Sequence, residues 1–392
     1  MSEVASEPAS NARITCKIDG ALCHSVQIHL RDNHPTYTVK RYQEEFPGEP
    51  LFSEMAQVAM NKKRNEMANA AKVAKAMVVA GGSRQPFHEV FGLGEAKAAK
   101  NARGGNIMVA VFDDHDENAK LLLAERDPNY VFDIELTKTI LIALELNTGC
   151  YLWGYHGTGK TTVLEQVAAC VRRPFMRVQH TVGTEESHII GQYVVQDGAT
   201  VFQYGPLAIA MIEGYIYCAD EYDRAIAPVT SVYQPVLEGK PLYIKEAPPE
   251  MRLVKPHPNF RFVATGNTNG SGDETGLYQG TQMQDAANYS RFGVTVEVGY
   301  MDPKVEVMVV SGQAQIDKKD AEKIVSFAND FREAFKGGKV ASTISPRELI
   351  NAGRYAVMKG GDWRAGLKTA WGARLSRVDR EVADSYAQRI WA

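Results

Sequence analysis

The sequence of 392 residues lacks a long hydrophobic run, because Glu145, Asn147 and Asp220 interrupt its most apolar stretches. A membrane helix needs about 20 consecutive apolar residues, so we expect no membrane span. The first ten residues, MSEVASEPAS, are polar and acidic and lack the basic and apolar regions of a secretory signal. The five scattered cysteines do not form the pattern of a disulfide framework. These features predict a cytoplasmic protein.

The chain also lacks a strong excess of charge. Its formal net charge of −3 gives no electrostatic basis for wholesale binding of nucleic acid, which we do not expect as a partner. A content of 44% hydrophobic and 23% charged residues is typical of a globular protein. A chain of this length exceeds one compact core, so several domains are expected.

The pattern along the chain predicts four parts. From Tyr130 onward, apolar strand-like runs alternate with stretches of helical spacing, which predicts a mostly parallel sheet flanked by helices. Ser53 is a candidate N-cap for an Ala- and Lys-rich helix that ends before Gly81. The predicted parts are a zinc-finger-like domain (1–50), a helix and linker (51–105), an α/β nucleotide-binding domain (106–300) and a helical lid subdomain (301–392).

The stretch GYHGTGKTT, residues 154–162, matches the phosphate-binding pattern G-x-x-x-x-G-K-[ST]. Such a loop binds phosphate because backbone N–H groups and a helix N-terminus converge on the phosphate oxygens. Lys160 is expected to reach the β- and γ-phosphates of ATP, and the Thr161 hydroxyl to bind Mg²⁺. The residues expected to contact the nucleotide are Gly154, Tyr155, His156, Gly157, Thr158, Gly159, Lys160, Thr161 and Thr162.

An acidic pair follows the next apolar strand, YIYCADE. Asp220 lies 60 residues after Lys160 and can hold Mg²⁺ or its water shell, while Glu221 can orient the attacking water. An isolated Asp-Glu pair at a strand end is usually solvated. Downstream of a phosphate-binding loop, the catalytic interpretation is favoured.

Three further polar residues complete a candidate hydrolytic site. Asn267 ends the apolar run FRFVATGN and can fix the water or contact the γ-phosphate. Arg291 precedes the strand-like GVTVEV, and Arg347 begins a helix after Ser345 and Pro346. Such arginines most often form surface ion pairs. A γ-phosphate site nevertheless needs an arginine, which another subunit can supply.

In this order the motifs resemble those of the AAA+ ATPases, and within them the MoxR branch. The resemblance assigns Walker A (154–161), Walker B (Asp220 and Glu221), sensor 1 (Asn267), the arginine finger (Arg291) and sensor 2 (Arg347). Two hairpin signals fit the branch: YVVQDGATVFQY alternates around an Asp-Gly turn, and KPLYIKEAPPEMRLVKP precedes the sensor strand. In the family such hairpins face the ring pore and handle the client.

Several segments resemble the ATPase subunits of aerobic cobaltochelatases, the CobS-like proteins, over about residues 87–392. They are PNYVFDIELTKTILIAL, GYHGTGKTT, ADEYDRA, GDETGLYQGTQ and SPRELINAGRYA. The specific elements are His156 in the loop and the TGLYQGTQ segment, which general ATPase chemistry does not require. The resemblance implies a hexameric ring of identical subunits and an integrin-like-domain (CobT-like) partner. It also implies a large (CobN-like) subunit that inserts Co²⁺ into a corrin ring.

The N-terminal stretch CKIDGALCHSVQIHLRDNH has the spacing of a short zinc finger of the Ros/MucR type, with a carboxylate in place of the second cysteine. One cysteine, one carboxylate and two imidazoles can complete a tetrahedral Zn²⁺ site. Cys23 and His24 are alternative ligands, and a metal-free remnant of the fold is an equal alternative. The candidate ligands are Cys16, Asp19, His29 and His34.

These observations predict that ATP is used mechanically, by the ATPase subunit of a cobaltochelatase. One alternative is a MoxR-type chaperone that activates another metal-binding partner with an integrin-like domain. A second is a zinc-finger DNA-binding regulator with an ATPase motor. Against the regulator stands the lack of a concentrated basic face, because acidic residues offset the basic residues of the finger.

Overall fold

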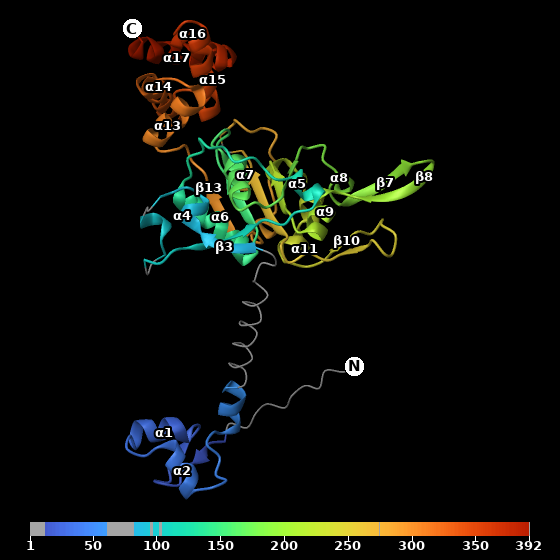
Figure 1. The fold of residues 1–392 in the computed structure, drawn as a ribbon, viewed down its shortest axis with the longest axis vertical. Helices are drawn as coiled ribbons and strands as arrows, with labels where there is room; N and C mark the ends of the chain where they lie inside the picture. Colours follow the sequence, from blue (N-terminus) through green and yellow to red (C-terminus); the bar gives the residue numbers. More distant parts are fainter. Residues whose placement is uncertain (1–11, 61–81, 95–96, 102–103, 274, 392) are drawn as a thin grey trace. The chain divides into compact units, whose positions relative to one another are not determined.

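The computed structural model describes residues 12–60, 82–94, 97–101, 104–273 and 275–391 (Figure 1). The chain divides into two compact units, Met1–Val78 and Val79–Ala392, called here the N-terminal and C-terminal units. Within these described ranges, no helix is both long and apolar enough to cross a membrane.

The described part of the N-terminal unit begins with a short hairpin that is followed by two helices. Its core consists of Cys16, Val26, Leu30 and Tyr42. The first helix begins after Ser25, whose hydroxyl accepts the Ile28 N–H at 3.2 Å and so caps an otherwise unpaired backbone donor. The elements are β1 (Ile14–Thr15) and β2 (Leu22–Cys23), which pair antiparallel, and α1 (Val26–Asn33) and α2 (Val39–Glu45).

The helix predicted after Ser53 begins as expected. Residues 54–60 are helical, and the Ser53 hydroxyl accepts the Ala56 N–H at 3.3 Å. The remainder of this predicted helix, residues 61–80, lies outside the described residues.

The C-terminal unit is built on a five-stranded parallel sheet, as the sequence predicts. The carboxyl ends of all five strands therefore meet at one edge, where binding sites of such sheets lie. The order across the sheet is β13 (Val294–Glu297), β5 (Cys150–Trp153), β12 (Arg261–Gly266), β9 (Ile216–Asp220) and β6 (Phe175–Gln179).

Helices cover both faces of the sheet. Successive strand residues enter different cores: Cys150 and Leu152 join one cluster, and Tyr151 joins the other. The first cluster contains α6 and α7, and the second contains α9 and α10. The helices of this region are α6 (Ile134–Leu146), α7 (Lys160–Cys170), α8 (Glu186–Ile190), α9 (Pro206–Glu213), η2 (Tyr222–Arg224), α10 (Ala227–Val232), α11 (Gln234–Leu237) and α12 (Ala286–Tyr289).

Both predicted hairpins are confirmed. β7 (Gly191–Gln196) pairs antiparallel with β8 (Ala199–Tyr204), and Figure 1 shows this hairpin projecting from the sheet region. Its two-residue turn has φ of 51° at Asp197 and 80° at Gly198, the left-handed pair that an Asp-Gly turn supplies. The second hairpin pairs β10 (Leu242–Tyr243) with β11 (Leu253–Val254).

A third hairpin lies where the sequence predicts a linker. β3 (Gly82–Pro86) pairs with β4 (Met108–Phe112), and Phe87 and Phe91 are buried against α6 and α7. The folded C-terminal unit therefore begins well before residue 106, because residues from both ends of the 82–105 segment are part of its core. Short helices follow in this region: α4 (Phe87–Val90), η1 (Lys97–Ala99) and α5 (Glu117–Lys120).

The last part of the C-terminal unit is helical and has its own core, which includes Phe327, Phe331 and Trp371. A buried ion pair joins two of its helices, because Arg332 donates to both carboxylate oxygens of Glu306 at 2.7 and 2.8 Å. The elements are α13 (Pro303–Ala314), α14 (Lys318–Lys336), α15 (Pro346–Met358), α16 (Trp363–Ala370), η3 (Gly372–Arg374) and α17 (Arg377–Ile390).

Candidate nucleotide-binding site

The phosphate-binding stretch, residues 154–162, follows β5 and continues into the first turn of α7, as predicted. Its glycines meet a steric requirement: a Cβ on Gly154 would lie 2.4 Å from the Val298 carbonyl oxygen, and one on Gly157 would lie 2.4 Å from the Ser345 Cβ. Gly157 also has φ of 71°, which disfavours other residues. The loop can therefore pack this closely only with glycine at these positions.

A cavity of about 470 Å³ opens over the loop at the carboxyl ends of the strands. It brings together most of the predicted site residues, although they come from segments almost 200 residues apart. Those lining it are His156, Gly157, Gly159, Lys160, Thr161, Thr162, Asp220, Glu221, Asn267 and Arg347. Arg347 reaches it from the first turn of α15, which starts at the predicted Ser345 cap.

Three loop residues do not line this cavity: Gly154, Tyr155 and Thr158. They shape the loop instead. The Thr158 hydroxyl donates to the Tyr155 carbonyl at 2.9 Å, and the Tyr155 ring stacks on Tyr300 at 5.7 Å between centroids. Their contribution is to fix the path of the backbone that carries the phosphate-binding N–H groups.

Lys160 is folded back onto the loop. Its Nζ donates to the carbonyls of Gly154 and Tyr155 at 2.8 and 2.7 Å and to Asn267 Oδ1 at 3.3 Å. Burial lowers the pKa of Lys160 to about 8, because the charged form loses hydration. The Gly154 and Tyr155 carbonyls compensate the Lys160 charge only in part, and a nucleotide phosphate would supply a full negative charge.

The Asp220 carboxylate is fixed by three different elements. It accepts the Thr161 hydroxyl of α7 at 2.7 Å, the Thr265 hydroxyl of β12, and Arg177 of β6 at 2.6 and 2.8 Å. Burial acts to raise the pKa of Asp220, but the hydrogen bonds from Thr265, Thr161 and Arg177 outweigh it and keep the pKa below its usual range. An ionised carboxylate beside a threonine hydroxyl is the donor set that Mg²⁺ prefers.

Glu221 follows the strand in a left-handed conformation, with φ of 52°. This turn directs its carboxylate to the cavity wall, where Oε2 lies 3.0 Å from Arg224 Nε and 3.4 Å from Gln179 Nε2. Strained backbone of this kind is concentrated at functional sites. The position is suited to a residue that orients water.

Asp223 is a site residue that the sequence analysis missed. Its buried Oδ2 accepts the N–H groups of Asn267 and Thr268 at 2.7 and 2.9 Å and the Thr268 hydroxyl at 3.0 Å. Burial raises the pKa of Asp223 even though these bonds favour the ionised form. The carboxylate thereby joins the acidic turn after β9 to the end of β12. The sequence feature that could have identified Asp223 is its position in ADEYDRA, shortly after the Asp220-Glu221 pair.

A second cavity, of about 210 Å³, also borders the loop. The two cavities share four residues: Gly157, Gly159, Thr162 and Arg347. Its more apolar wall, with a few amides, suits a nucleobase beside a phosphate site. Sequence reasoning missed this wall because it combines Asn129, Tyr130, Val131, Met301, Val309, Gln313, Ile350 and Asn351, which share no local pattern.

Arg291 stands apart from the other predicted site residues, and it lines neither of these cavities. It follows α12, and its Nε lies 2.8 Å from Glu238 Oε1. Both side chains are partly exposed, at 27% and 33%.

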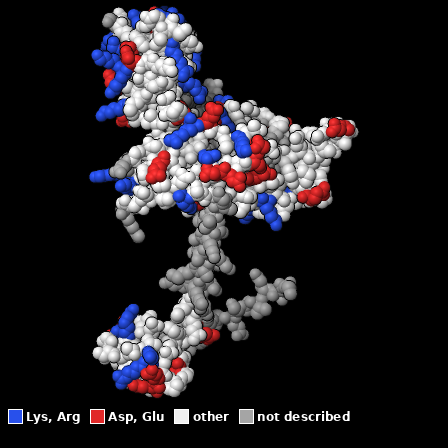
Figure 2. All heavy atoms as spheres, in the orientation of Figure 1, with Lys and Arg blue, Asp and Glu red and all other residues white. Residues whose placement is uncertain are grey.

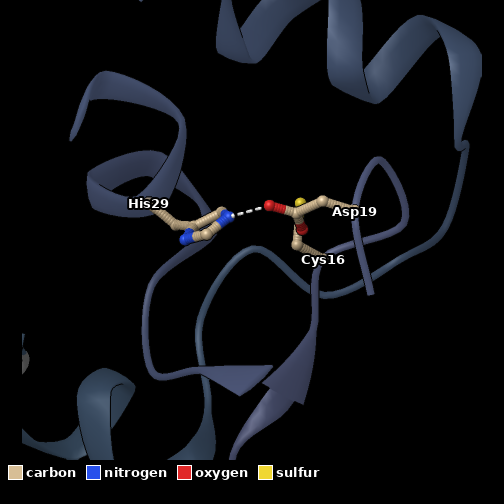
Figure 3. Close-up of side chains that lie close together, drawn as sticks. All are labelled: Cys16, Asp19 and His29. Carbon is tan, nitrogen blue, oxygen red and sulfur yellow. Dashed lines mark hydrogen bonds and ion pairs between the residues drawn. The ribbon is translucent and has the colours of Figure 1, made fainter. Parts of the chain in front are cut away.

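The predicted metal ligands of the N-terminal unit lie close together, and Figure 3 shows Cys16, Asp19 and His29. His29 Nε2 and His34 Nε2 are 2.7 and 2.9 Å from the same Asp19 oxygen, and the ligand atoms of Cys16, Asp19 and His29 lie within 4.8 Å of one another. His29 is within α1, whereas His34 is its C-cap and not part of the helix. The alternative ligand His24 bonds Ser53 through Nδ1 at 2.9 Å.

Two family descriptions match consecutive parts of the chain. Residues 149–292 match the AAA domain of the dynein-related subfamily. Residues 306–388 match the CbbQ/NirQ/NorQ C-terminal domain. The first match spans four of the five sheet strands, the cavity residues from His156 to Asn267, and Arg291, which lines neither cavity; the second spans the helical part that supplies Arg347.

The aerobic cobaltochelatase subunit CobS of a Sinorhizobium species is 33% identical to the chain over 276 residues. The similar region covers 68% of this chain and 82% of that protein. The chain belongs to the MoxR-type AAA+ ATPases and resembles CobS. Membership of this family implies that the chain binds ATP and Mg²⁺.

Other relatives are similar over a shorter region. An uncharacterized protein of Staphylococcus aureus is 30% identical over 216 residues, covering 53% of this ATPase and 77% of that protein. Among solved structures, RuvB of Thermotoga maritima is 14% identical with a TM-score of 0.39, covering 68% of this chain and 72% of that one.

The geometry separates nucleotide binding from hydrolysis. We expect Lys160→Ala to abolish nucleotide binding, because it removes the buried cation of the loop. Glu221→Gln should keep ATP binding but lower turnover at least about a hundredfold, since an amide cannot take a proton from water. Calorimetry and a phosphate-release assay measure the two effects, with exposed Glu213→Gln as the control. Normal turnover of Glu221→Gln would exclude its catalytic role.

Proposed function

We propose that this ATPase forms a ring and drives Co²⁺ insertion into a corrin by a cobaltochelatase complex. The observation that carries the proposal is its 33% identity to CobS over 82% of that subunit. Its partners would be an integrin-like-domain subunit and a large corrin-binding subunit. Cobalt and corrin are substrates of that complex and are not assigned to residues of this chain.

Reconstitution tests this proposal. The tagged chain is purified from its own cells, the co-purifying subunits are identified, and ATP-dependent cobalt insertion into a metal-free corrin is followed by its absorption spectrum. We expect insertion with the wild-type chain and none with Lys160→Ala, because the latter cannot bind nucleotide. Equal insertion with Lys160→Ala, or partners that insert no cobalt, would contradict the proposal.

A MoxR-type chaperone that activates another metal-binding partner is the second candidate. The CbbQ/NirQ/NorQ C-terminal match over residues 306–388 favours it, because that domain is not confined to CobS. The same purification separates the candidates: an integrin-like-domain partner without a corrin-binding subunit supports the chaperone. A DNA-binding regulator has less support, since basic and acidic side chains lie side by side on the visible face of the N-terminal unit (Figure 2).

We propose that Arg291 acts on the nucleotide of the adjacent subunit, a role that requires a ring. Its side chain is bound to Glu238 and does not line the cavity of its own subunit. An arginine that stabilises γ-phosphate charge must reach that phosphate. In a ring, the neighbouring subunit provides such a site.

Mixing two inactive variants tests this role. Arg291→Ala should bind ATP almost normally and hydrolyse it poorly, because the lost charge acts mainly in the transition state. In rings that also contain Lys160→Ala chains, an intact Arg291 can serve an intact adjacent pocket, so part of the turnover should return. A mixture of Lys160→Ala with Glu221→Gln is the control and should stay inactive. No recovery in rings shown by sizing to be mixed would refute action in trans.

For the N-terminal unit we propose a Zn²⁺ site formed by Cys16, Asp19, His29 and His34. His29 Nε2 and His34 Nε2 both lie within hydrogen-bond distance of Asp19 Oδ2. The Cys16 sulfur lies within 4.8 Å of the Asp19 and His29 ligand atoms (Figure 3). This donor set suits tetrahedral zinc. Zinc would there stabilise a unit whose core is too small to be stable by itself.

Metal analysis of the purified chain tests the zinc site. Prepared without chelators, the protein should carry about one Zn per chain. Cys16→Ala combined with His34→Ala should release the metal and leave ATP binding intact, because the ATP site belongs to the other unit. Cys23→Ala is the matched control and should retain zinc. Absence of metal from the wild-type chain would make the cluster a hydrogen-bonded remnant of the fold.

A further inference from the structure

The segment GDETGLYQGTQ lies between Asn267 and Arg291 and has no role in the site described so far. Its Tyr278 is buried, with 8% of the residue exposed. The Tyr278 hydroxyl accepts the backbone N–H of His156 at 2.9 Å and lies 3.2 Å from His156 Nδ1. The one tyrosine thus contacts both the main chain and the side chain of the phosphate-binding loop.

Tyr278 is held independently of that loop. The Asp273 carboxylate accepts its N–H at 2.5 Å, and its carbonyl accepts the N–H and hydroxyl of Thr281 at 2.9 and 2.8 Å. The segment is also tied to the acidic turn after β9, because Gln282 N–H donates to the Asp223 carbonyl at 2.7 Å. The tyrosine ring is therefore a fixed support against which the loop rests.

The two cavities show which phosphate this contact concerns. Tyr278 and His156 line the larger cavity, together with Glu221 and Asn267, and neither residue lines the second cavity, whose more apolar wall suits a nucleobase. Along a bound nucleotide the γ-phosphate is the group farthest from the base. The tyrosine hydroxyl therefore lies at the γ-phosphate end, on the side where water must be oriented.

The imidazole supports the same geometry. Burial, together with Arg374 and Lys160, lowers the pKa of His156, so the ring is neutral near pH 7. A neutral Nδ1 can accept the Tyr278 hydroxyl proton while the hydroxyl oxygen accepts the His156 N–H. Both groups then constrain the loop through one oxygen atom.

We propose that Tyr278 is a positioning residue for ATP hydrolysis, whose hydroxyl fixes His156 of the loop at the γ-phosphate. The proposal depends on the ATPase activity and not on the client of the complex. A merely structural tyrosine would stabilise the fold and the binding of every nucleotide equally. A positioning tyrosine affects the step in which the γ-phosphate is transferred.

Tyr278→Phe in the full-length chain distinguishes the two roles, because it removes only the hydroxyl. We expect kcat to fall about tenfold, as the loss of one hydrogen bond in the transition state implies. KM for ATP, the affinity for ADP and the melting temperature should stay close to the wild-type values, with KM and affinity changing less than about twofold. Tyr204→Phe, which loses a hydroxyl bonded to the Met251 carbonyl at 3.0 Å, is the matched control and should leave kcat unchanged.

Two results would overturn the proposal: a kcat for Tyr278→Phe within twofold of the wild-type value, or a loss of ADP affinity as large as the loss of kcat. The second result would give Tyr278 a structural role in the loop. A failure of the ring proposal would be recognised separately. Turnover would then not recover in rings that mix Arg291→Ala with Lys160→Ala chains, whereas Tyr278→Phe could still be compared with the wild type.

Discussion

The Asp220 carboxylate is the point at which the site's separate elements are joined. Hydroxyl and guanidinium groups from α7, β12 and β6 all bind it, at the edge where the parallel strands end. A buried charge requires such partners, so their loss would leave an uncompensated carboxylate in the core. The same requirement aligns the loop helix with two strands and places Glu221 and Asn267 on one cavity wall.

Sequence predicted the parts of this arrangement that local chemistry determines. Glycines in the loop and Pro346 after Ser345 each have one dominant structural meaning, and the acidic pair after an apolar strand acquires one because it lies downstream of the loop. The Asp197-Gly198 turn is similar, since few other pairs adopt two successive left-handed conformations. Parallel topology then brings these separate predictions to one edge, which is why so many predicted residues share a cavity.

Contacts between distant segments could not be predicted in this way. The wall of the second cavity combines Tyr130, Met301 and Ile350, none of which differs in its local pattern from an ordinary core residue. In the sequence Asp223 resembles a solvated turn residue, and only the folded structure shows that it binds the Asn267 N–H at the end of β12. The β3–β4 hairpin was missed because its strands flank a Lys-rich stretch, and only their register with one another reveals the pair.

The loop and the helical subdomain are mechanically connected through aromatic packing. Tyr155 of the loop stacks on Tyr300 with an interplanar angle of 8°, and the Arg332 guanidinium lies 3.8 Å from the Tyr300 ring centroid. Arg332 is itself fixed by the buried Glu306 carboxylate. Close-packed groups of this kind transmit displacement and do not absorb it. The phosphate-binding loop is thus packed, through Tyr300 and Arg332, against the helices that carry Glu306 and Arg332, α13 and α14.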